Sequence, residues 1–481
     1  MKKGQIYEGI VERLNFPNKG IVISEGEEVL VKNCIPGQKI RFRVSQKRKG
    51  KYEGRLVDVI EKSPLETRDK ACSIFGDCGG CNYQTISYEE QLELKKKQVI
   101  KLLDGVCSDY EFEGILASPK EWNYRNKMEY SFGDDVKDGP LTLGFHKRGS
   151  FYDILTAGDC ALVDDDYNKV LECILDYFTE LDADYYHKMT RKGYLRHLLV
   201  RRAAKTGELL VNIVTTSQED DLINKLRPDE DTDVASDEIL DDKVKSQKFI
   251  YDPLIKRLLE LKLSGSIGGV LHTYNDSVAD VVQSDYMILL HGQDNIYEEV
   301  LGLVFKISVF SFFQTNTFGA EVLYRKVREY VGDTKDKQIF DLYCGTGTIA
   351  QLLAPVAKKV VGVEIVEEAV EAAKENAFLN NLGNCKFIVG DVLKVMDELK
   401  DEPDIIVVDP PRDGINPKAI KKIIDCGVDK IVYVSCKPTS LVRDLKILQE
   451  AGYKVDKVCC VDMFPQTPHV ECVVLMSKVE D

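Results

Sequence analysis

A buried strand that runs into a glycine turn constrains this chain most. Residues 338–343 form an apolar run that predicts a strand, and Cys344–Thr348 follow as a turn of small residues before a helix. Small residues at such a turn let the backbone approach a ligand closely. A second apolar run ends in Glu364, about 20 residues after Gly345, which is the spacing at which an acid binds ribose hydroxyls. The pattern predicts an open α/β sheet that binds a nucleoside-containing cofactor.

Polar residues follow three further predicted strands. Asp391 comes after the run 387–389, Asp409 begins an Asp-Pro-Pro sequence, and Cys436 follows the run 431–434. Open α/β sheets bind ligands at the carboxyl ends of their strands, so we expect these side chains at one edge of the sheet. Residues 455–461 and 470–476 read as a terminal hairpin.

This arrangement favours a methyltransferase that uses S-adenosyl-L-methionine over a dinucleotide dehydrogenase. Dehydrogenases usually carry the fuller GxGxxG turn, although Ala350 at its last position is a permitted variant. Cys436 itself has two interpretations at this point. A thiol at the ligand-binding edge can be a nucleophile, but free cysteines are also among the most buried core residues.

The first 60 residues predict a small β-barrel. Turn signals separate five short runs with strand character, and the hairpin around Lys49 carries a cluster of Lys and Arg. The runs are 5–14, 21–24, 28–31, 39–44 and 52–60. This segment holds 13 Lys and Arg against 7 Asp and Glu, whereas the whole chain has a net charge of -15. The segment resembles the TRAM domain, an oligonucleotide-binding-fold relative found on RNA-modifying enzymes; a generic barrel with a basic loop is the alternative.

A cysteine cluster follows the barrel. Cys72, Cys78 and Cys81 are separated by five and then two residues, and Cys160 is the candidate fourth ligand. Structural zinc sites usually pair two CxxC motifs, whereas three clustered cysteines with a distant fourth are common for a [4Fe-4S] centre. The spacing favours iron-sulfur, with zinc and a metal-free CxxC as alternatives. The gap of five argues against radical S-adenosylmethionine chemistry.

Aromatic and basic residues interleave in the middle of the chain. They occur in residues 121–132 and 143–152, where rings can stack on bases and cations can bind phosphates. Alternation also describes an ordinary half-exposed strand. The candidate RNA contacts are Tyr124, Arg125, Lys127, Lys147 and Arg148. Residues 229–242 carry eight Asp and Glu and no Lys or Arg, which predicts a solvated surface insertion without a metal role.

The length and the absence of long apolar runs set the broad class. A chain of 481 residues is expected to form several domains, and we place boundaries at 1–62, 63–305 and 306–481. The helix predicted over 88–103 could pack on the last of these domains. No run is long enough to span a bilayer and the N-terminus lacks signal-peptide features, so we expect a cytoplasmic location, no membrane partner and no obligate protein partner.

Six motifs give the chain a family resemblance. They are FSFFQTN (310–316), DLYCGTG (341–347), GVE (362–364), DPPRDG (409–414), VSCKP (434–438) and HVECV (469–473). The sequence resembles RNA uracil-5-methyltransferases over nearly its whole length, specifically the 23S ribosomal RNA branch with a TRAM domain and an iron-sulfur cluster. The acidic insertion is the main departure, and it touches none of these motifs.

The resemblance implies a covalent mechanism. Uracil C5 is a poor nucleophile, so the Cys436 thiolate adds to C6 first, with Lys437 as a candidate helper. Glu471 is the general base that removes the C5 proton after methyl transfer. Gln314, Tyr343, Glu364, Asp391 and Asp409 are assigned to the cofactor and uracil pocket. Arg412 contacts phosphate or braces the Asp-Pro-Pro turn.

The substrate implied is a loop uridine of 23S rRNA, because base flipping costs less in a loop than in a duplex. The same chemistry on the T-loop of tRNA is the nearest alternative. An iron-sulfur protein that binds RNA without catalysis is a third, which the Cys436 and Glu471 motifs argue against.

Overall fold

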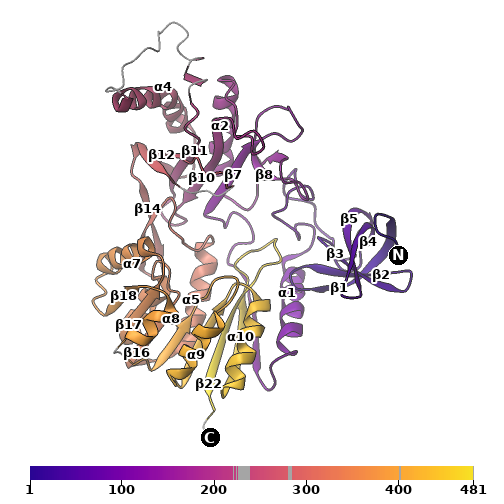
Figure 1. Ribbon diagram of the computed structural model, residues 1–481, viewed down its shortest axis with the longest axis vertical. Helices are drawn as coiled ribbons and strands as arrows, with labels where there is room; N and C mark the ends of the chain where they lie inside the picture. The colour runs from indigo at the N-terminus through magenta and orange to yellow at the C-terminus, as the bar shows by residue number, and fades with distance from the viewer. Residues whose placement is uncertain (220–221, 224, 226–238, 280–283, 400–401, 480–481) are drawn as a thin grey trace. The chain divides into compact units, whose positions relative to one another are not determined.

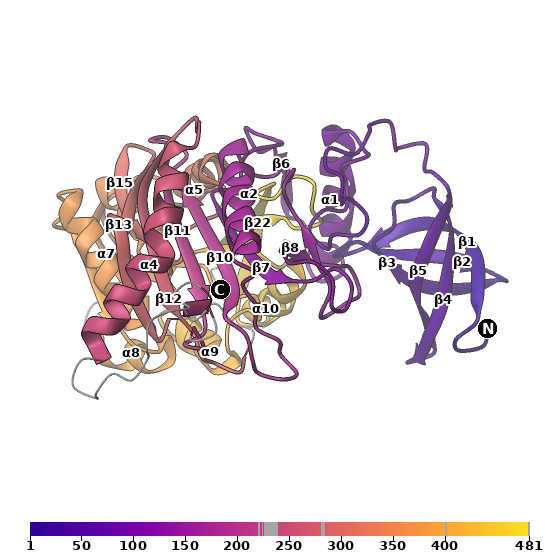
Figure 2. The same cartoon turned by 90° about the horizontal axis from the view of Figure 1, so that it is seen from above.

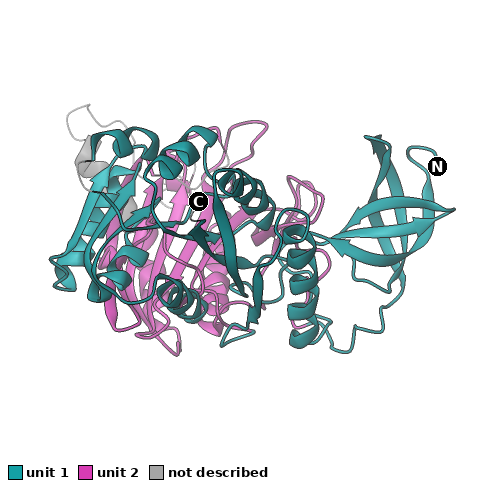
Figure 3. Cartoon of the chain, turned by 90° about the horizontal axis from the view of Figure 1, so that it is seen from below, with its two compact units in different colours: residues 1–70, 80–121, 318–481 teal, residues 71–79, 122–317 magenta. Residues whose placement is uncertain are grey.

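The structure is a computed structural model that describes all of the 481 residues except 220–221, 224, 226–238, 280–283, 400–401 and 480–481. The chain forms two compact units, coloured teal and magenta in Figure 3. Unit 1 comprises residues 1–70, 80–121 and 318–481, and unit 2 comprises residues 71–79 and 122–317. Most of the predicted acidic insertion lies outside the described residues. Among the helices that are described, none is long and apolar enough to cross a membrane.

Unit 1 begins with a closed five-stranded barrel, which confirms the predicted N-terminal β-barrel. Its strands are β1 (Ile6–Asn15), β2 (Lys19–Ser24), β3 (Glu27–Lys32), β4 (Lys39–Arg48) and β5 (Lys51–Glu61). The order is β1-β2-β3-β5-β4, and β4 pairs with β1 to close the barrel, whose crossing strands are visible in Figure 2. Along β4, Ile40, Phe42 and Val44 are buried while Arg41 and Arg43 face outward. This alternation is what a barrel wall requires.

The C-terminal part of unit 1 is an eight-stranded sheet with the order β18-β17-β16-β19-β20-β22-β21-β6. Its strands are β6 (Glu111–Leu116), β16 (Thr334–Leu342), β17 (Ala357–Glu364), β18 (Cys385–Val389), β19 (Ile405–Val408), β20 (Lys430–Ser435), β21 (Tyr453–Val461) and β22 (Glu471–Lys478). Neighbouring strands are parallel except that β22 runs antiparallel to β20 and β21. The predicted Rossmann-like methyltransferase fold is therefore confirmed.

The chain order reverses direction at β16, which has β17 on one side and β19 on the other. Open α/β sheets bind ligands at such a switch point, outside the carboxyl ends of the strands. Because β22 is antiparallel to β20, its first residue lies at this same edge. The register confirms this, since Ser435 at the end of β20 pairs with Cys472 at the start of β22.

Helices of unit 1 cover the sheet (Figure 1). They are α1 (Tyr88–Leu103), α5 (Thr317–Val331), α6 (Thr348–Leu353), α7 (Glu367–Leu379), α8 (Val392–Glu398), α9 (Pro417–Asp425) and α10 (Pro438–Glu450), with a short 3-10 turn at Ala354–Val356. One apolar core joins α8, α9, α10 and α1 to the sheet, with Val99 and Leu103 as the contribution of α1. The helix predicted over 88–103 thus packs in unit 1, where Ser87 caps it by accepting the Glu90 N–H at 3.3 Å.

Unit 2 is built on a seven-stranded sheet of order β13-β12-β11-β10-β7-β8-β9. The strands are β7 (Lys127–Gly133), β8 (Thr142–His146), β9 (Ile154–Thr156), β10 (Leu195–Arg202), β11 (Glu208–Thr215), β12 (Ser266–Tyr274) and β13 (Tyr286–Gly292), with a separate pair β14 (Asn295–Val300) and β15 (Leu303–Ser308). Helices α2 (Asp165–Glu180) and α4 (Ile239–Glu260) pack together on this sheet.

Candidate active site

The carboxyl edge of the unit 1 sheet brings four predicted residues together. Tyr343 follows β16, Asp409 follows β19, Cys436 follows β20, and Glu471 opens β22. The strands β16, β19 and β20 are parallel, so the residues that follow them lie at one edge of the sheet. Because β22 is antiparallel to β20, its first residue lies at that edge too. The pairing of β20 with β22 therefore brings together Cys436 and Glu471, which lie 35 positions apart in sequence.

Cys436 is a half-buried thiol surrounded by acidic groups. Its pKa is raised to about 11, mainly by burial and also by the nearby carboxylates of Glu471 and Asp409, while Arg412 acts in the opposite direction. The backbone turn that presents the thiol is fixed, since the Lys437 N–H donates to Ser435 Oγ at 3.2 Å. The thiol is thus protonated at neutral pH in the free protein.

The two carboxyl groups at this edge share the same bias toward protonation. Glu471 is only 3 % exposed, and its pKa is raised to about 8, mainly by burial and also by Asp409, against a lowering effect of Arg412. Burial raises the pKa of Asp409 to about 7. Carboxyl groups that titrate near neutral pH are suited to proton transfer, and such shifts cluster at functional sites.

Arg412, rather than Lys437, supplies the positive charge that acts on this set. The Arg412 guanidinium lowers the pKa of both Cys436 and Glu471. Lys437 Nζ instead lies 3.8 Å from a carboxylate oxygen of the exposed Asp413. The Arg412 backbone is anchored because its carbonyl accepts the Ser440 hydroxyl at 2.7 Å.

The glycine turn after β16 is sharp and tightly packed. Tyr343 has a φ of 66° and Gly347 a φ of 72°, so the chain turns sharply through the left-handed region. A side chain at position 347 would meet the Phe387 ring at 2.5 Å, which explains the glycine there. Glu364 braces the turn, since one carboxylate oxygen accepts the Gly345 N–H at 3.1 Å.

Acids stand at the ends of β17 and β18, as the spacing predicts. The other oxygen of Glu364 accepts the N–H groups of Ile365 at 2.8 Å and Val366 at 3.0 Å. Asp391 caps α8 by accepting the Leu393 N–H at 2.9 Å, and its charge raises the pKa of Tyr343. Asp391 therefore lies close to Tyr343, and it also has a structural role that sequence reasoning did not assign.

Two residues of this edge escaped the sequence analysis. Asp341 is fully buried, and one of its oxygens accepts the Ala350 N–H at 2.9 Å while the other has no hydrogen-bond partner. Burial and the Asp409 charge raise its pKa well above the usual range. Tyr324 of α5 is also buried. Its burial and the nearby charges of Asp409 and Glu471 raise its pKa. Asp341 stands inside a quoted motif, but Tyr324 has no sequence signal.

Gln314, the fifth residue assigned to the pocket, belongs to unit 2. There its backbone carbonyl accepts a hydrogen bond from the Asn126 side chain at 3.0 Å. The same asparagine donates to the Thr317 hydroxyl at 2.8 Å. The FSFFQTN segment is thus held within unit 2 by side-chain contacts.

The predicted metal ligands divide between the units. Cys72, Cys78 and Cys160 belong to unit 2 and Cys81 to unit 1. Within unit 2 the first two thiols raise the pKa of Cys160, which burial already brings to about 11. However, no group of three or more His, Cys, Asp or Glu side chains in the described part of the chain is arranged to hold a metal ion. The geometry does not support the predicted metal centre, which stays a prediction.

Hydrogen bonds fix the cysteine segment within unit 2. Asp159 accepts the Ser73 N–H at 2.7 Å and the Ser73 hydroxyl at 3.0 Å. The Arg148 guanidinium donates to the Cys78 carbonyl at 3.1 Å, and the Arg148 N–H donates to the Asp77 carbonyl at 2.6 Å. Arg148, a candidate RNA contact, therefore also holds this segment.

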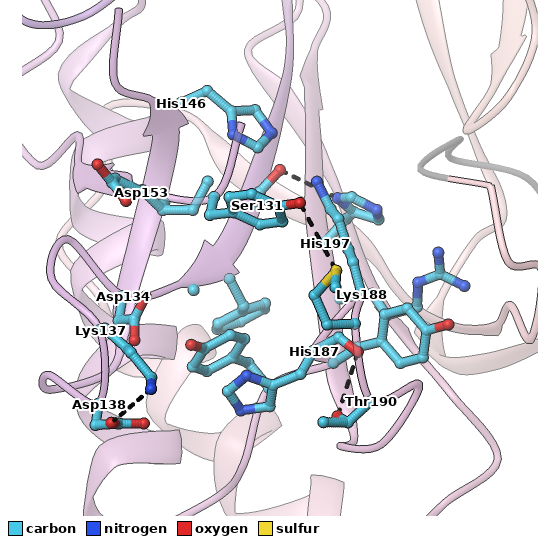
Figure 4. A pocket seen from close by; sticks show the side chains of 18 residues that line it. Ser131, Asp134, Lys137, Asp138, His146, Asp153, His187, Lys188, Thr190 and His197 are labelled. Atoms are coloured by element: carbon cyan, nitrogen blue, oxygen red, sulfur yellow. Dashed lines mark hydrogen bonds and ion pairs between the residues drawn. The ribbon is translucent and has the colours of Figure 1, made fainter. Parts of the chain in front are cut away.

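A cavity of about 670 Å³ opens in unit 2 (Figure 4). Its walls carry the rings of Tyr152, Tyr185, Tyr186 and His187, and the Tyr185 and His187 ring centroids lie 4.1 Å apart. The buried Arg196 guanidinium lies 4.6 Å from the Tyr186 ring centroid and is occupied by backbone carbonyls. Ring walls suit a flat ligand, and this size falls within the range of small-molecule pockets.

The other candidate RNA contacts have mixed outcomes. Tyr124 is 2 % exposed, so its ring is part of the core and the interpretation as a stacking residue is wrong. Lys127 is ion-paired with Glu129 at 2.6 Å, and the Arg125 guanidinium donates to the Lys127 carbonyl at 3.1 Å. In contrast, Phe151 and Tyr152 are 82 % and 60 % exposed, so the second aromatic segment does present rings to solvent.

Comparisons with known proteins show which family this chain resembles. Residues 287–479 match the family model described as tRNA (uracil-5-)-methyltransferase. The chain is 48 % identical to a protein of Clostridium tetani described as an uncharacterized RNA methyltransferase, over 99 % of both chains. A protein of Caldanaerobacter subterraneus with the same description is also 48 % identical, over 99 % of this chain and 100 % of the relative. Among solved structures, the Pyrococcus abyssi tRNA (uracil-54, C5)-methyltransferase in complex with S-adenosyl-L-homocysteine has a TM-score of 0.71 and 26 % identity, covering 98 % of this chain and 100 % of its own.

Proposed function

Because this chain belongs to the RNA uracil-5-methyltransferase family, we propose that it methylates C5 of a specific loop uridine in 23S rRNA. The observation that carries the proposal is the meeting of Cys436, Glu471 and Asp409 at the carboxyl edge of the sheet. A thiol beside two carboxyl groups that titrate near neutral pH matches a reaction that needs a nucleophile and a base.

Cys436 is the proposed nucleophile. Its thiolate adds to uracil C6, forming an S–C6 bond and shifting the C5–C6 electron pair toward C5 and the O4 carbonyl. A pKa near 11 means that the thiol must lose its proton within the site, and Arg412 is the cation that favours this ionisation. The thiol proton passes to solvent. Protonation of Asp409 removes a negative charge that opposes this ionisation, whereas Glu471 must be ionised for the later proton transfer.

Glu471 is the proposed general base. After C5 acquires a methyl group, it still carries its original proton, and a carboxylate must take that proton before the S–C6 bond can break. The electrons of the C5–H bond then restore the C5–C6 double bond as the Cys436 thiolate leaves. Burial makes the ionised Glu471 a stronger base than an exposed glutamate, because its pKa rises to about 8.

The proposed methyl-donor site lies beside these residues. When bound, S-adenosyl-L-methionine supplies an electrophilic methyl group on a positively charged sulfur. Glu364 would bind the ribose and Asp391 the adenine side, while Tyr343 and Asp409 would line the donor. Gln314 is proposed for the same pocket from its motif. The left-handed turn at Tyr343 and the tight contact that forbids a side chain at Gly347 support this fit.

RNA contacts are proposed at two places outside the chemistry. The basic β4–β5 hairpin, with Lys47, Arg48 and Lys51, would neutralise phosphates and hold the RNA while the base is flipped. The exposed Tyr152 at the cavity of unit 2 would stack on an unpaired base. Both contacts would change affinity for RNA rather than the chemical step.

A tRNA substrate is the second candidate. The observation that favours it is the similarity to the Pyrococcus abyssi enzyme, whose description names uracil 54 of tRNA. Transcripts of 23S rRNA fragments and of tRNA, incubated with tritiated methyl donor, separate the two candidates. Label at uridine C5 in the rRNA fragments alone supports the proposal, and label in tRNA alone would replace it with the alternative.

The cysteines keep a separate proposal. Cys72 and Cys78 both act on the pKa of Cys160 within unit 2, and the four cysteines, Cys81 included, would hold a [4Fe-4S] cluster with a structural or RNA-shaping role. Anaerobically purified protein should then be brown and contain about four irons per chain. Protein that binds zinc alone, or no metal, would contradict the proposal.

A further inference from the structure

The segment that leads into Glu471 is buried, although it is a connection between two strands. It joins β21 to β22, and Asp462, Met463 and Gln466 within it are fully buried. Connections normally run over the surface, because a buried one must find partners for its polar groups. The partners found here come from a distant part of the sequence.

Helix α1 supplies an ion pair to the start of the segment. Lys95 Nζ lies 2.6 Å from a carboxylate oxygen of Asp462, and neither side chain is exposed at all. Lys95 also donates to the Phe464 carbonyl at 3.1 Å. A fully buried pair of this kind gives little net stability, because desolvation of the two charges offsets their attraction.

The same helix holds the middle of the segment through Gln91. Its side-chain nitrogen donates to Gln466 Oε1 at 2.9 Å, and its side-chain oxygen accepts the Gln466 N–H at 2.8 Å. Gln466 has a φ of 69°, an uncommon conformation for a residue with a side chain. The two hydrogen bonds hold the segment in this conformation five residues before Glu471.

A third contact comes from the residues directly after Cys81. The backbone N–H groups of Asn82 and Tyr83 both donate to the Gln466 carbonyl, at 2.8 and 3.1 Å. Gln91 also donates to the Tyr83 carbonyl at 3.3 Å, so its side chain links residues 82–83 to the segment between β21 and β22. Gln466 is therefore held at its N–H, its carbonyl and its side chain.

We propose that Gln91 and Lys95 are positioning residues that align the Glu471 carboxylate with uracil C5. The inference rests on the proposed function, because it concerns the base of that reaction. The contacts fix the path of residues 462–466, and from there the chain enters β22 at Glu471. Without these contacts β22 would still pair with its neighbours, but the Glu471 carboxylate would be positioned less accurately.

The step at risk is proton removal, which follows formation of the S–C6 bond. Variants with a misaligned Glu471 should form the adduct with Cys436, accept the methyl group and then release the product slowly. The expected signature is a covalent complex of protein with ordinary uridine RNA that survives denaturation. A loss of fold or of RNA binding would not produce it, because no adduct would form.

The test uses Gln91→Leu and the double variant Lys95→Met/Asp462→Leu, which replaces the ion pair with apolar side chains. With unmodified RNA and methyl donor, kcat should fall by up to about a hundredfold, the value expected for a displacement of about 1 Å. The KM for RNA should fall together with kcat, because the slowed step follows adduct formation and methyl transfer, and the covalent complex should accumulate on denaturing gels. Lys96→Met is the matched control on α1, since Lys96 is half-exposed and pairs with Glu93; it should behave as wild type.

The test uses two variants that alter different contacts, so that it still gives a result if one of them fails to fold. Gln91→Leu leaves the buried ion pair intact. Wild-type kcat in a folded variant, or a reduced kcat without any covalent complex, would overturn the inference. These results differ from failure of the proposed function, in which the wild-type protein itself would make no 5-methyluridine and would form no complex with 5-fluorouridine RNA.

Discussion

The hairpin of β21 and β22 carries two buried carboxylates with opposite surroundings. Asp462, just after β21, lies against the Lys95 ammonium at 2.6 Å. Glu471, the first residue of β22, has another acid and a thiol as neighbours, and its pKa rises to about 8. The chain thus places one acid for structure and one for chemistry within ten residues of each other.

The difference shows how burial alone does not decide what an acid does. A buried carboxylate with a cation at contact distance anchors the chain through that ion pair. A buried carboxylate whose neighbours share its charge accepts a proton near neutral pH, which is what a general base requires. The exposed Arg412 prevents a still larger rise in the pKa of Glu471.

The largest effect should come from the thiol that Glu471 faces. Cys436→Ala removes the nucleophile, so kcat for uridine methylation should fall by about 10⁴-fold or more. The variant should also form no covalent complex with 5-fluorouridine RNA. Cys426→Ala is the matched control, because this half-buried thiol lies at the end of α9 and donates to the Lys422 carbonyl at 3.3 Å. Full activity of Cys436→Ala would contradict the assignment of Cys436 as the nucleophile.

Glu471→Gln should give the next largest effect. An amide cannot take the C5 proton, so kcat should fall by about 10²- to 10⁴-fold. Unlike the cysteine variant, this one should accumulate a methylated covalent complex that is visible with ordinary uridine RNA. A fall in activity without the complex would assign Glu471 to a step before the adduct.

The structural acid should respond in stability. Lys95→Met leaves the Asp462 carboxylate buried without its cation, so the free energy of unfolding should drop by about 3–5 kcal/mol. The double variant Lys95→Met/Asp462→Leu should recover most of this loss, although the Phe464 carbonyl also loses a donor. Denaturant unfolding measures both, with Lys96→Met within about 0.5 kcal/mol of wild type as control. Equal losses of unfolding free energy in the single and double variants would contradict the view that Lys95 compensates the buried charge of Asp462.

The pH profile should report on Glu471. The base acts when ionised, and a pKa raised to about 8 means that kcat rises with pH through about 8. Arg412→Ala removes a charge that lowers this pKa, so the rise should move to higher pH. Exposed Lys421→Ala should leave it in place. An Arg412→Ala profile that moves to lower pH, or does not move, would contradict the assigned electrostatics.

The smallest effect should come from the barrel, far from either acid in sequence. Alanine at Lys47, Arg48 and Lys51 should weaken RNA binding and reduce the slope of log affinity against log salt by about 0.7–0.9 per lost phosphate contact. Binding of the methyl donor, measured by calorimetry, should be unchanged. An unaltered salt slope would exclude this hairpin as an RNA contact.

Much of the fold follows from local sequence patterns. Turn residues separate the barrel strands, and each motif acid stands at the end of an apolar run, so Cys436, Asp409 and Glu364 lie near strand ends as expected. The antiparallel β22 then brings Glu471 to the same edge. These features depend on contacts between segments that are close in sequence or repeat a regular pattern.

The features that sequence reasoning missed depend on distant contacts. Lys95 and Asp462 are more than 360 residues apart, and a polar residue on a helix gives no sign that it will be buried. Lys437 adjoins Cys436 in sequence and Arg412 lies 24 positions before it, yet the folded chain shows that Arg412 is the cation that lowers the pKa of the thiol. Tyr124 reads as a surface ring but packs in the core, because alternation does not reveal which face is buried.

Mass spectrometry of the trapped complex tests the central claim most directly. Glu471→Gln protein is incubated with methyl donor and a uridine-containing RNA, denatured and digested with protease and nuclease. We predict a peptide containing Cys436 that carries a nucleotide heavier than uridine by one methyl group. A methylated RNA product without any modified Cys436 peptide, or a nucleotide attached to another cysteine, would contradict the account.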